Sequence, residues 1–359
     1  MTLHHTRPQE PSIDTGLTPT LYLTLEDAAR ELDAKILIAG AAVRKGLSVI
    51  IGQQWLLVNN HGFIPKGLML FKGMNARLAN ASRVVVGSGH LAAVLDEEVL
   101  GLSDTPYIQR YIDPDLANHC HLFLAQGEKH VEAIAGKTKV DKDKIQNVGN
   151  PRVDLLRPPF SELYQKEAEG LREEHGDYIL LNTNAGRANS AFGSVEQFRD
   201  VVIRVGWMKP DDPDDEALFR SAVDFDMVNL ALIRDFVVKA TTALPNTRII
   251  IRPHGSERQE TWDKFGERFP NVRVIRDGRH ASWMLGSRAV IHTCCTTGLE
   301  AEILGSVAIN LRPVDYNTSL HHVFISNIAN VSVNSVDETI TIVKRVLLRD
   351  RRDIDRDHN

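Results

Sequence analysis

The chain has 359 residues, which is long for one hydrophobic core and sufficient for two domains. Hydrophobic residues make up 43% and charged residues 25% of the chain, as in ordinary soluble globular proteins. The net charge of −5 gives no reason to expect nucleic acid as a partner, and no apolar run approaches the ~20 residues of a membrane span.

Four segments are expected along the chain. Residues 1–19 are polar, contain prolines and lack the apolar core of a signal peptide, which predicts a flexible tail. Residues 20–155 and 156–335 are predicted to form two Rossmann-like domains. Residues 336–359 are predicted to form a terminal helix and a tail with charges of both signs.

The first half begins with a strand–helix–strand pattern. Leu21–Leu25 predicts a strand, Asp27–Lys45 a helix, and Ser48–Gly52 a second strand. We expect Leu32, Ile36 and Val43 to lie on one apolar stripe of the helix. Further strands are expected at Gly67–Phe71, Arg83–Val86, Leu91–Leu95, His121–Ala125 and Ile145–Val148, with helices at Asn75–Ser82 and Glu128–Ala135.

The second half repeats the alternation after an interruption. Gly149–Arg152 and Arg157–Pro159 break the pattern and are typical of a connection between domains. Strands are expected at Tyr178–Leu181, Arg248–Ile251, Val272–Ile275, Ala289–Ile291 and Val307–Ile309, and helices near Ser161–Glu174 and Met227–Leu244. Asp211–Asp215 is expected to be an acidic surface loop. The sequence therefore predicts an α/β protein with two Rossmann-like domains facing across a cleft.

The three cysteines give no sign of a disulfide framework, which fits a reducing cytoplasm. His119-Cys120-His121 has the alternation of a possible metal site on a strand. The apolar residues that follow favour the start of a buried strand instead, and no second ligand cluster is present. No metal site is expected.

The segment His292–Gly305 has the pattern of a strand, a hydroxyl-rich turn and a helix. The free N–H groups of a helix N-terminus bind anions, which predicts a phosphate site. Thr297 and Glu300 also have the spacing of a capping box. Both interpretations can hold, because Thr293 and Thr296 stay free for a ligand.

Three acidic residues follow the predicted strand Leu91–Leu95 directly. Within Asp96-Glu97-Glu98, neighbouring carboxylates can raise one another's pKa and serve as a base or a nucleophile. A solvated acidic turn that starts the next helix explains the same residues equally well.

Two further polar clusters follow strands of the second half. Asn182-Thr183-Asn184 can bind a base, a sugar hydroxyl or a phosphate, although an Asx turn is the commoner outcome. Arg252-Pro253-His254-Gly255-Ser256-Glu257 combines a fixed charge with an adjustable donor, which suits a phosphate leaving group. Trp262 is expected to be a packing residue.

Taken in order, these clusters resemble the bacterial surface carbohydrate biosynthesis family. The matching segments are Glu31–Lys35, Gly149–Asp154, Asn182–Asn184, Arg252–Glu257 and His292–Gly305, and the similarity extends from about Leu21 to Pro313. That family is similar to GT-B glycosyltransferases that use CMP-activated ulosonic acids, such as Kdo transferases of capsule assembly and bacterial sialyltransferases.

Those enzymes share an acidic pair followed by Gly, a His-Pro motif and a Ser/Thr motif. Glu97-Glu98, His254 and the threonines Thr293, Thr296 and Thr297 occur in the same order. Val99 stands where Gly is expected, and Gly255 stands where Pro is expected.

The resemblance implies a cytoplasmic, metal-independent GT-B glycosyltransferase without a cofactor. It would transfer Kdo or a related ulosonic acid from a CMP-sugar donor to a surface polysaccharide acceptor. The nucleotide would bind to the second domain, residues 156–335, and the acceptor would enter from the first, residues 20–155. Such a role allows peripheral association with a membrane-bound polysaccharide assembly complex. Glu98, Glu97 and His254 would be catalytic. The residues expected to bind the nucleotide and its phosphate are Asn182, Thr183, Asn184, Arg252, His254, Ser256, Thr293, Thr296, Thr297, Gly298 and Glu300.

Two alternatives remain open at this stage. Another GT-B enzyme would share the fold and the phosphate turn: a UDP-sugar transferase, a UDP-sugar epimerase, or a transferase acting on CDP-glycerol. A GT-B-like scaffold that has lost catalysis would also share them.

Overall fold

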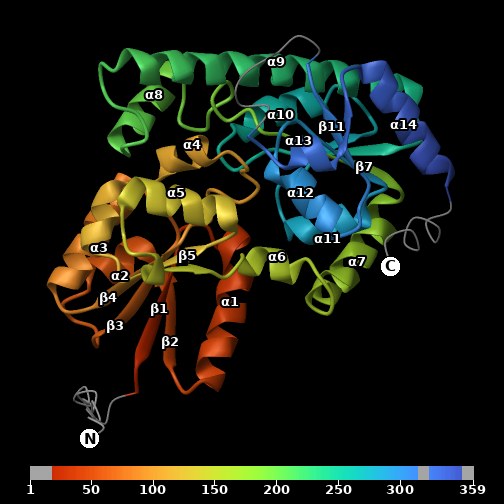
Figure 1. The fold of residues 1–359 in the computed structure, drawn as a ribbon. Coiled ribbons are helices and arrows are strands. Elements are labelled where there is room, and N and C mark those ends of the chain that lie inside the picture. The colour runs from red at the N-terminus through yellow and green to blue at the C-terminus, as the bar shows by residue number, and fades with distance from the viewer. Residues whose placement is uncertain (1–17, 314–322, 350–359) are drawn as a thin grey trace, which may run out of the picture.

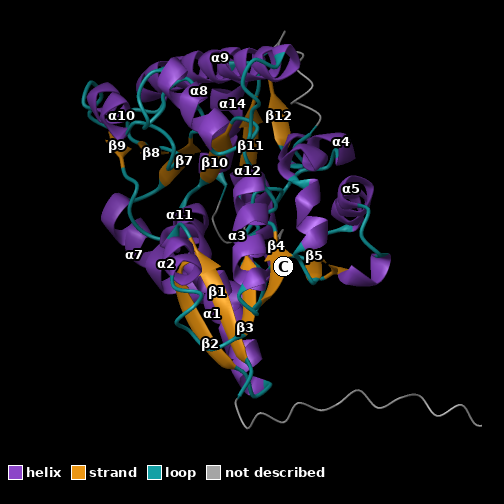
Figure 2. Ribbon diagram, turned by 90° about the vertical axis from the view of Figure 1, so that its left-hand side faces the viewer, coloured by secondary structure: helices purple, strands orange, loops and turns teal. Residues whose placement is uncertain are grey.

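The computed structural model describes residues 18–313 and 323–349. Nearly all of the predicted N-terminal tail and the charged C-terminal tail lie outside these residues. The described chain forms two parallel six-stranded sheets, each flanked by helices. Figure 2 shows the two sheets one above the other, and Figure 1 shows the first half of the chain packed beside the second. This is the predicted α/β architecture of two Rossmann-like domains.

The first sheet has the strand order β2-β1-β3-β4-β5-β6. Its strands are β1 (Thr20–Leu25), β2 (Ser48–Gln53), β3 (Gly67–Phe71), β4 (Leu91–Leu95), β5 (Leu122–Ala125) and β6 (Ile145–Asn147). The helices of this half are α1 (Ala28–Arg44), α2 (Gln54–Asn59), α3 (Ala76–Gly87), α4 (Thr105–Ile108) and α5 (Glu128–Thr138). Short 3-10 helices cover Gln109–Tyr111, Pro114–Asn118 and Lys142–Lys144.

The connection to the second half is largely helical. It contains α6 (Pro151–Leu155), a 3-10 helix at Phe160–Tyr164, and α7 (Gln165–His175). Asn150 accepts a hydrogen bond from the Arg152 N–H and so caps α6. The polar helix predicted near Ser161–Glu174 is therefore divided into a 3-10 segment and α7.

The second sheet has the order β12-β11-β10-β7-β8-β9. Its strands are β7 (Tyr178–Asn182), β8 (Arg248–Arg252), β9 (Val272–Val274), β10 (Ala289–His292), β11 (Ala308–Leu311) and β12 (Val331–Val333). Its helices are α8 (Val195–Arg204), α9 (Pro213–Ala243), α10 (Gln259–Gly266), α11 (His280–Gly286), α12 (Thr296–Ile303), α13 (Ser326–Ala329) and α14 (Val336–Leu348).

Helices cover both faces of each sheet, which explains why the strands are apolar runs rather than alternating ones. In the second sheet, Ile249 and Ile251 pack toward α9, α10 and α14, whereas Ile250 packs toward Trp283 of α11. The terminal helix α14 belongs to this core through Val336, Ile340, Val343 and Val346. Among the described residues, no helix is both long and apolar enough to cross a membrane.

Two predicted elements are wrong. Arg83–Val86 is the last part of helix α3 rather than a strand, because Val85 is buried against the first core on a continuous helical turn. Asp211–Asp215 is not simply a surface loop. Asp212 is the N-cap of α9 and accepts from the Asp214 and Asp215 N–H groups, so the acidic run starts the longest helix.

Helix α1 also differs from expectation, in its buried stripe. Ile36 and Val43 are 53% and 59% exposed, so they do not face the sheet. The buried positions include Ala34 together with Glu31 and Lys35, both at 0% exposure. Charged residues are rarely buried unless they are paired, so this stripe points to a polar network beneath α1.

Each sheet has one point at which its strand order reverses. In the first sheet this point lies between β1 and β3, and in the second between β7 and β10. The helices on either side of such a point leave opposite faces of the sheet, which opens a crevice at the carboxyl ends of the strands. The second crevice contains polar side chains that were predicted from sequence to lie at strand ends. The first crevice lies next to β4, and the loop after β4 carries the predicted residues Glu97 and Glu98.

The two domains touch at several places. Arg279 of the second domain pairs with Asp33 of α1 at 3.1 Å, and Arg110 pairs with Asp215 at 2.9 Å. A separate strand-like contact ties the domains through the loop after β4: the Ser103 N–H donates to the Val323 carbonyl at 2.8 Å, and the Ile325 N–H donates to the Gly101 carbonyl at 2.8 Å. The loop that carries Glu97 and Glu98 is thereby anchored to the second half of the chain.

Candidate functional site

Of the three acidic residues that follow β4, Glu98 is the one that reaches solvent. Its Oε1 accepts from Arg30 at 2.9 Å and from Lys72 at 3.2 Å, while 30% of the side chain is exposed. Burial alone would raise the pKa of Glu98, but the two cations outweigh it and lower that pKa to about 2. The carboxylate is thus ionised throughout the physiological pH range.

Glu97 and Lys35 form a buried ion pair, 2.8 Å from Oε1 to Nζ, with side chains 1% and 0% exposed. A charge removed from water in this way is stable only with its partner in place. The catalytic role of Glu97 stays a prediction, and in this structure its carboxylate is buried and paired with Lys35.

Asp96 lies beneath Glu98 and is 1% exposed. Its Oδ1 accepts from the Glu98 N–H at 2.8 Å, whereas Oδ2 has no hydrogen-bond partner among the described residues. Burial raises the pKa of Asp96 to about 7, and Glu98 and Glu97 add to the rise while Lys72 and the Glu98 N–H oppose it. The pKa values of two carboxylates in one loop are therefore shifted in opposite directions.

The partners of these carboxylates come from the crevice between β1 and β3. Lys72 follows β3 directly and contacts Glu26 at 2.9 Å and Glu31 at 3.3 Å, in addition to Glu98. Sequence analysis missed this group. A usable signal was present: Glu31 and Lys35 stand one helical turn apart on the side of α1 that also carries Ala34.

The crevice of the second sheet has two polar residues at its centre. Asn182 ends β7 and Thr293 follows β10, and the pairing of Leu181 with Ile291 places them on neighbouring strands. Asn182 is 2% and Thr293 1% exposed. Both polar atoms of the Asn182 amide and the Thr293 hydroxyl lack a hydrogen-bond partner in the part of the chain that the structure describes. Buried polar groups are normally paired, so these atoms point to a ligand or a water that completes the site.

The turn between β10 and α12 is held by three buried side chains. His292 accepts the Cys295 N–H at Nδ1 and donates from Nε2 to Asn330 Oδ1 at 2.8 Å. Asn310 accepts the Cys294 N–H at 3.2 Å, where the chain takes a positive φ of 46°. Burial lowers the pKa of His292 to about 4, so its ring is a neutral structural group. The turn is therefore pre-formed, with backbone N–H groups at the N-terminus of α12.

Gly298 in the first turn of α12 packs directly on this scaffold. A Cβ at Gly298 would lie 2.2 Å from His292 Nε2 and 2.3 Å from Asn330 Oδ1. Only glycine fits between these atoms. The residue thus supports the turn from behind.

The capping box predicted for Thr297 and Glu300 is wrong. Helix α12 begins at Thr296, its N-cap is Cys295, and no side chain caps it. Glu300 instead pairs with Arg152 of α6 at 2.5 Å. Thr296 and Thr297 are half-buried at the uncapped start of the helix, and Thr296 packs near Gly101 of the other domain.

The loops after β7 and β8 are joined by Glu257, which is fully buried. Its carboxylate accepts from the Thr183 hydroxyl at 2.5 Å and from the Trp262 indole at 2.8 Å. The Thr183 hydroxyl is therefore engaged in a hydrogen bond that holds the two loops together. Trp262 is fully buried, which confirms the prediction that it is a packing residue. Asn184 is half-buried in the first of these loops.

His254 lies in the loop after β8, and charged residues of the first domain influence its pKa. Its Nδ1 accepts from the Ser256 N–H at 3.2 Å and lies 2.7 Å from the Ser256 hydroxyl, so Nε2 carries the proton of the neutral ring. Part of His254 is exposed to solvent, but the surrounding protein desolvates the ring and thereby lowers the pKa of His254. Arg30 lowers this pKa further, whereas Glu257 and Glu98 raise it. Arg30 and Glu98 of the first domain are thus near enough to His254 to act on its charge.

Arg252 is placed differently from the other predicted phosphate ligands. Its guanidinium donates to the carbonyls of Asp277, Arg276 and Gly278 at 2.6–3.1 Å and lies 5.2 Å from the centre of the Trp283 ring. Burial lowers the pKa of Arg252 to about 10. Its predicted role at the phosphate is untested; here its donors fix the loop after β9.

The described residues include no group of three or more His, Cys, Asp or Glu side chains that could hold a metal ion. His119-Cys120-His121 does not converge. Cys120 contacts the Ser82 hydroxyl, and His121 Nδ1 accepts from the Ala92 N–H.

No family model matches the chain, and no curated protein matches it. Solved structures do resemble it. A putative UDP-N-acetylglucosamine 2-epimerase from Listeria monocytogenes has a TM-score of 0.56 at 9% identity, over 93% of this chain and 89% of that one. The chain has a GT-B-like fold.

Two other structures of this fold carry informative ligands or activities. The UDP-GlcNAc 2-epimerase from Methanocaldococcus jannaschii, solved with UDP-GlcNAc and UDP, has a TM-score of 0.53 at 13% identity and covers 93% of this chain and 94% of its own. The wall teichoic acid polymerase TagF has a TM-score of 0.54 at 9% identity and covers 94% and 82%. At these identities the likeness describes the fold alone.

Proposed function

We propose that the chain is a GT-B enzyme of surface carbohydrate synthesis that acts on a nucleotide-activated sugar or polyol. The nucleotide's phosphates would bind in the crevice between β7 and β10. The observation that carries this proposal is the pair of unsatisfied buried side chains there, Asn182 and Thr293, beside the free N-terminus of α12. A phosphate would accept from the Thr293 hydroxyl, the Asn182 amide and the helix N–H groups.

The reacting centre would lie between His254 and Glu98. It is the sugar carbon in a nucleotide sugar and the phosphorus next to the polyol in a nucleotide polyol. A neutral His254 with its proton on Nε2 donates to a departing phosphate without a change of its own charge. Glu98 stays ionised, so it can act as a nucleophile or stabilise positive charge at the sugar carbon, but it is poorly suited to take up a proton. In this proposal the protein's own donors stabilise the phosphate, and no metal ion takes part.

A donor that carries a nucleoside diphosphate has more support than one that carries a nucleoside monophosphate. Of the solved structures of this fold, the Methanocaldococcus jannaschii epimerase named above is bound to UDP-GlcNAc and UDP. Another structure of TagF comes from a crystal soaked with CDPG. A UDP-sugar epimerase or a CDP-glycerol-type transferase therefore has more support than the CMP-ulosonate transferase. The latter stays a second candidate, because Glu97-Glu98, His254 and the threonine motif occur in that family's order.

The test is a thermal-shift comparison of CMP, CDP and UDP with the purified chain, with and without EDTA. We expect CDP or UDP to raise the melting temperature, and EDTA to leave the shift intact. A response to CMP alone would favour the ulosonate transferase. No response to any nucleotide would contradict the proposal and favour a scaffold that lacks catalysis.

A further inference from the structure

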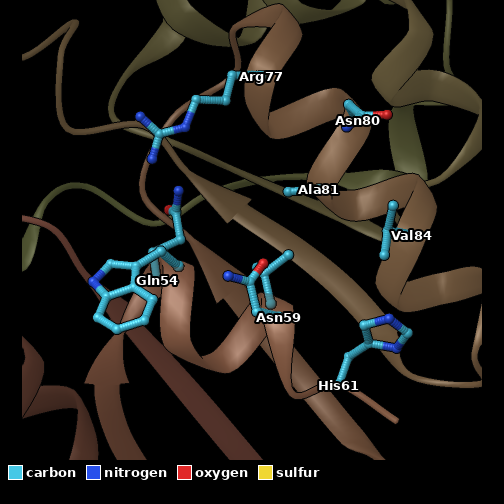
Figure 3. A pocket seen from close by; sticks show the side chains of 9 residues that line it. Gln54, Asn59, His61, Arg77, Asn80, Ala81 and Val84 are labelled. Carbon is cyan, nitrogen blue, oxygen red and sulfur yellow. The ribbon is translucent and has the colours of Figure 1, made fainter.

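The first domain contains a pocket that the proposed chemistry does not use. It lies between α2 and α3, has a volume of about 410 Å³, and is lined by Gln54, Trp55, Val58, Asn59, His61, Arg77, Asn80, Ala81 and Val84. Figure 3 shows Gln54 and Asn59 rising from α2 toward Arg77 and Ala81 of α3. The volume is within the range of small-molecule sites.

The lining combines an exposed indole with amide groups. Trp55 lines the pocket and is 61% exposed, and Asn59 and Asn80 are also exposed. Sugars present an apolar C–H face, which packs on aromatic rings, and a rim of hydroxyl groups, which bond to amides and guanidinium groups. The pocket therefore has the chemistry that recognises a pyranose ring.

Two lining residues have unsatisfied polar atoms. Gln54 is 3% exposed, and its Oε1 has no hydrogen-bond partner within the described ranges 18–313 and 323–349. The same holds for Nδ1 of His61. Both residues line the pocket, so hydroxyl groups of a ligand could satisfy these atoms after small side-chain rotations.

The pocket is joined to the candidate catalytic residue by a chain of polar contacts. Gln54 Nε2 and an Arg77 Nη2 donate to Glu26 Oε1 at 3.1 and 2.7 Å. The other oxygen of Glu26 contacts Lys72 at 2.9 Å, and Lys72 contacts Glu98 at 3.2 Å. A ligand in the pocket would thus contact residues that are connected to Glu98, on the same domain, through Glu26 and Lys72.

We propose that this pocket is a carbohydrate subsite that holds a sugar residue of the acceptor glycan, with its ring stacked on Trp55. Binding of a glycan here stands on the pocket alone. Only its description as the acceptor rests on the proposed function.

The test uses an array of oligosaccharides from bacterial capsules and lipopolysaccharide cores, probed with the whole chain. We expect the unchanged protein to bind at least one glycan. Trp55→Ala should weaken that binding tenfold or more, and Trp55→Phe should weaken it only a few-fold because a smaller ring remains. The matched control is Trp207→Ala, which removes a 49% exposed indole from the second domain and should bind as the unchanged protein does.

Failure to bind any glycan on the array, or equal binding by Trp55→Ala and the unchanged protein, would overturn the inference. An equal loss in Trp207→Ala would overturn it too, since that loss would not belong to the pocket. CDP and UDP thermal shifts of the same variants separate this result from the proposed function. Trp55→Ala should show the same nucleotide-induced thermal shift as the unchanged protein. If the unchanged protein shows no thermal shift, the proposed function is contradicted, but the glycan subsite is not.

Discussion

Arg152 of the interdomain connection and Glu300 of α12 form an ion pair of 2.5 Å, with side chains only 15% and 7% exposed. His280 lies 3.8 Å from the same carboxylate. Glu300 is therefore held by groups of the protein itself. The pair ties α12 to the joint between the domains, where Ala34, Leu155 and Ala281 share a small apolar cluster.

Replacing Glu300 with Gln should lower stability rather than nucleotide affinity. Loss of a largely buried charge partner leaves Arg152 uncompensated, and we expect a loss of about 1–3 kcal/mol in urea unfolding. The exposed Glu338→Gln is the control and should stay within ~0.5 kcal/mol. A tenfold drop in nucleotide affinity without loss of stability would instead make Glu300 a ligand, as the resemblance had implied.

Glu98→Gln should abolish turnover and leave nucleotide binding nearly unchanged. The substitution preserves size while it removes the negative charge that Arg30 and Lys72 hold in place. Steady-state assays with the nucleotide that binds, together with calorimetry, separate the two effects. Glu132→Gln, a change at an exposed site of the same domain, serves as the control and should remain active. An active Glu98→Gln enzyme would remove this carboxylate from the mechanism.

Asp96→Asn should make the protein relatively more stable at high pH. The pKa of Asp96 is raised from 3.8 to about 7 in the folded chain, so the folded state holds an extra proton between these values. The stability that this proton provides is fully present below pH 4 and is lost as pH rises through 7. Each pKa unit corresponds to about 1.4 kcal/mol, so the advantage of Asn over Asp should reach a few kcal/mol at pH 8.

Urea unfolding of both proteins at pH 4.5 and at pH 8 measures this difference. A stability difference that does not change between the two pH values would show that Asp96 is ionised in the folded protein. The Asn side chain can still accept the Glu98 N–H, so loss of that hydrogen bond does not confuse the comparison.

Gly298→Ala should disrupt the turn before α12. The new Cβ would collide with His292 and Asn330, whose hydrogen bond supports the turn. We expect a loss of about 2–4 kcal/mol and little nucleotide binding. Gly170→Ala is the matched control: that glycine is also helical, has nothing within 4 Å of a Cβ, and should gain up to about 1 kcal/mol. Normal nucleotide binding by a folded Gly298→Ala protein would contradict this account of the turn.

Much of the fold could be predicted from sequence because its strands are short apolar runs bounded by polar turns. Leu91–Leu95 and its neighbours match the structure for that reason. The last part of α3 could not be predicted from sequence. The valines of Arg83–Val86 favour a strand locally, and only their packing against the first core stabilises the helix.

The candidate site shows the same division. Polar clusters after β4, β7, β8 and β10 were found because parallel strands place their carboxyl ends at one edge. The roles within a cluster were not found, because they depend on contacts far apart in the chain. Lys72 is 26 residues from Glu98, and Lys35 is 62 residues from Glu97, so no local pattern links them.

The most direct test of the account is calorimetric titration of CDP and UDP into the unchanged protein and into Thr293→Val. Valine keeps the volume of threonine and removes a buried hydroxyl that has no partner among the described residues. We predict that the ligand-free variant is as stable as the unchanged protein or more so, because no hydrogen bond is lost. Its affinity for the nucleotide should fall about tenfold, the ~1.4 kcal/mol of one hydrogen bond to a charged phosphate. Equal affinity in the two proteins, or no binding by either, would contradict a phosphate site between β7 and β10.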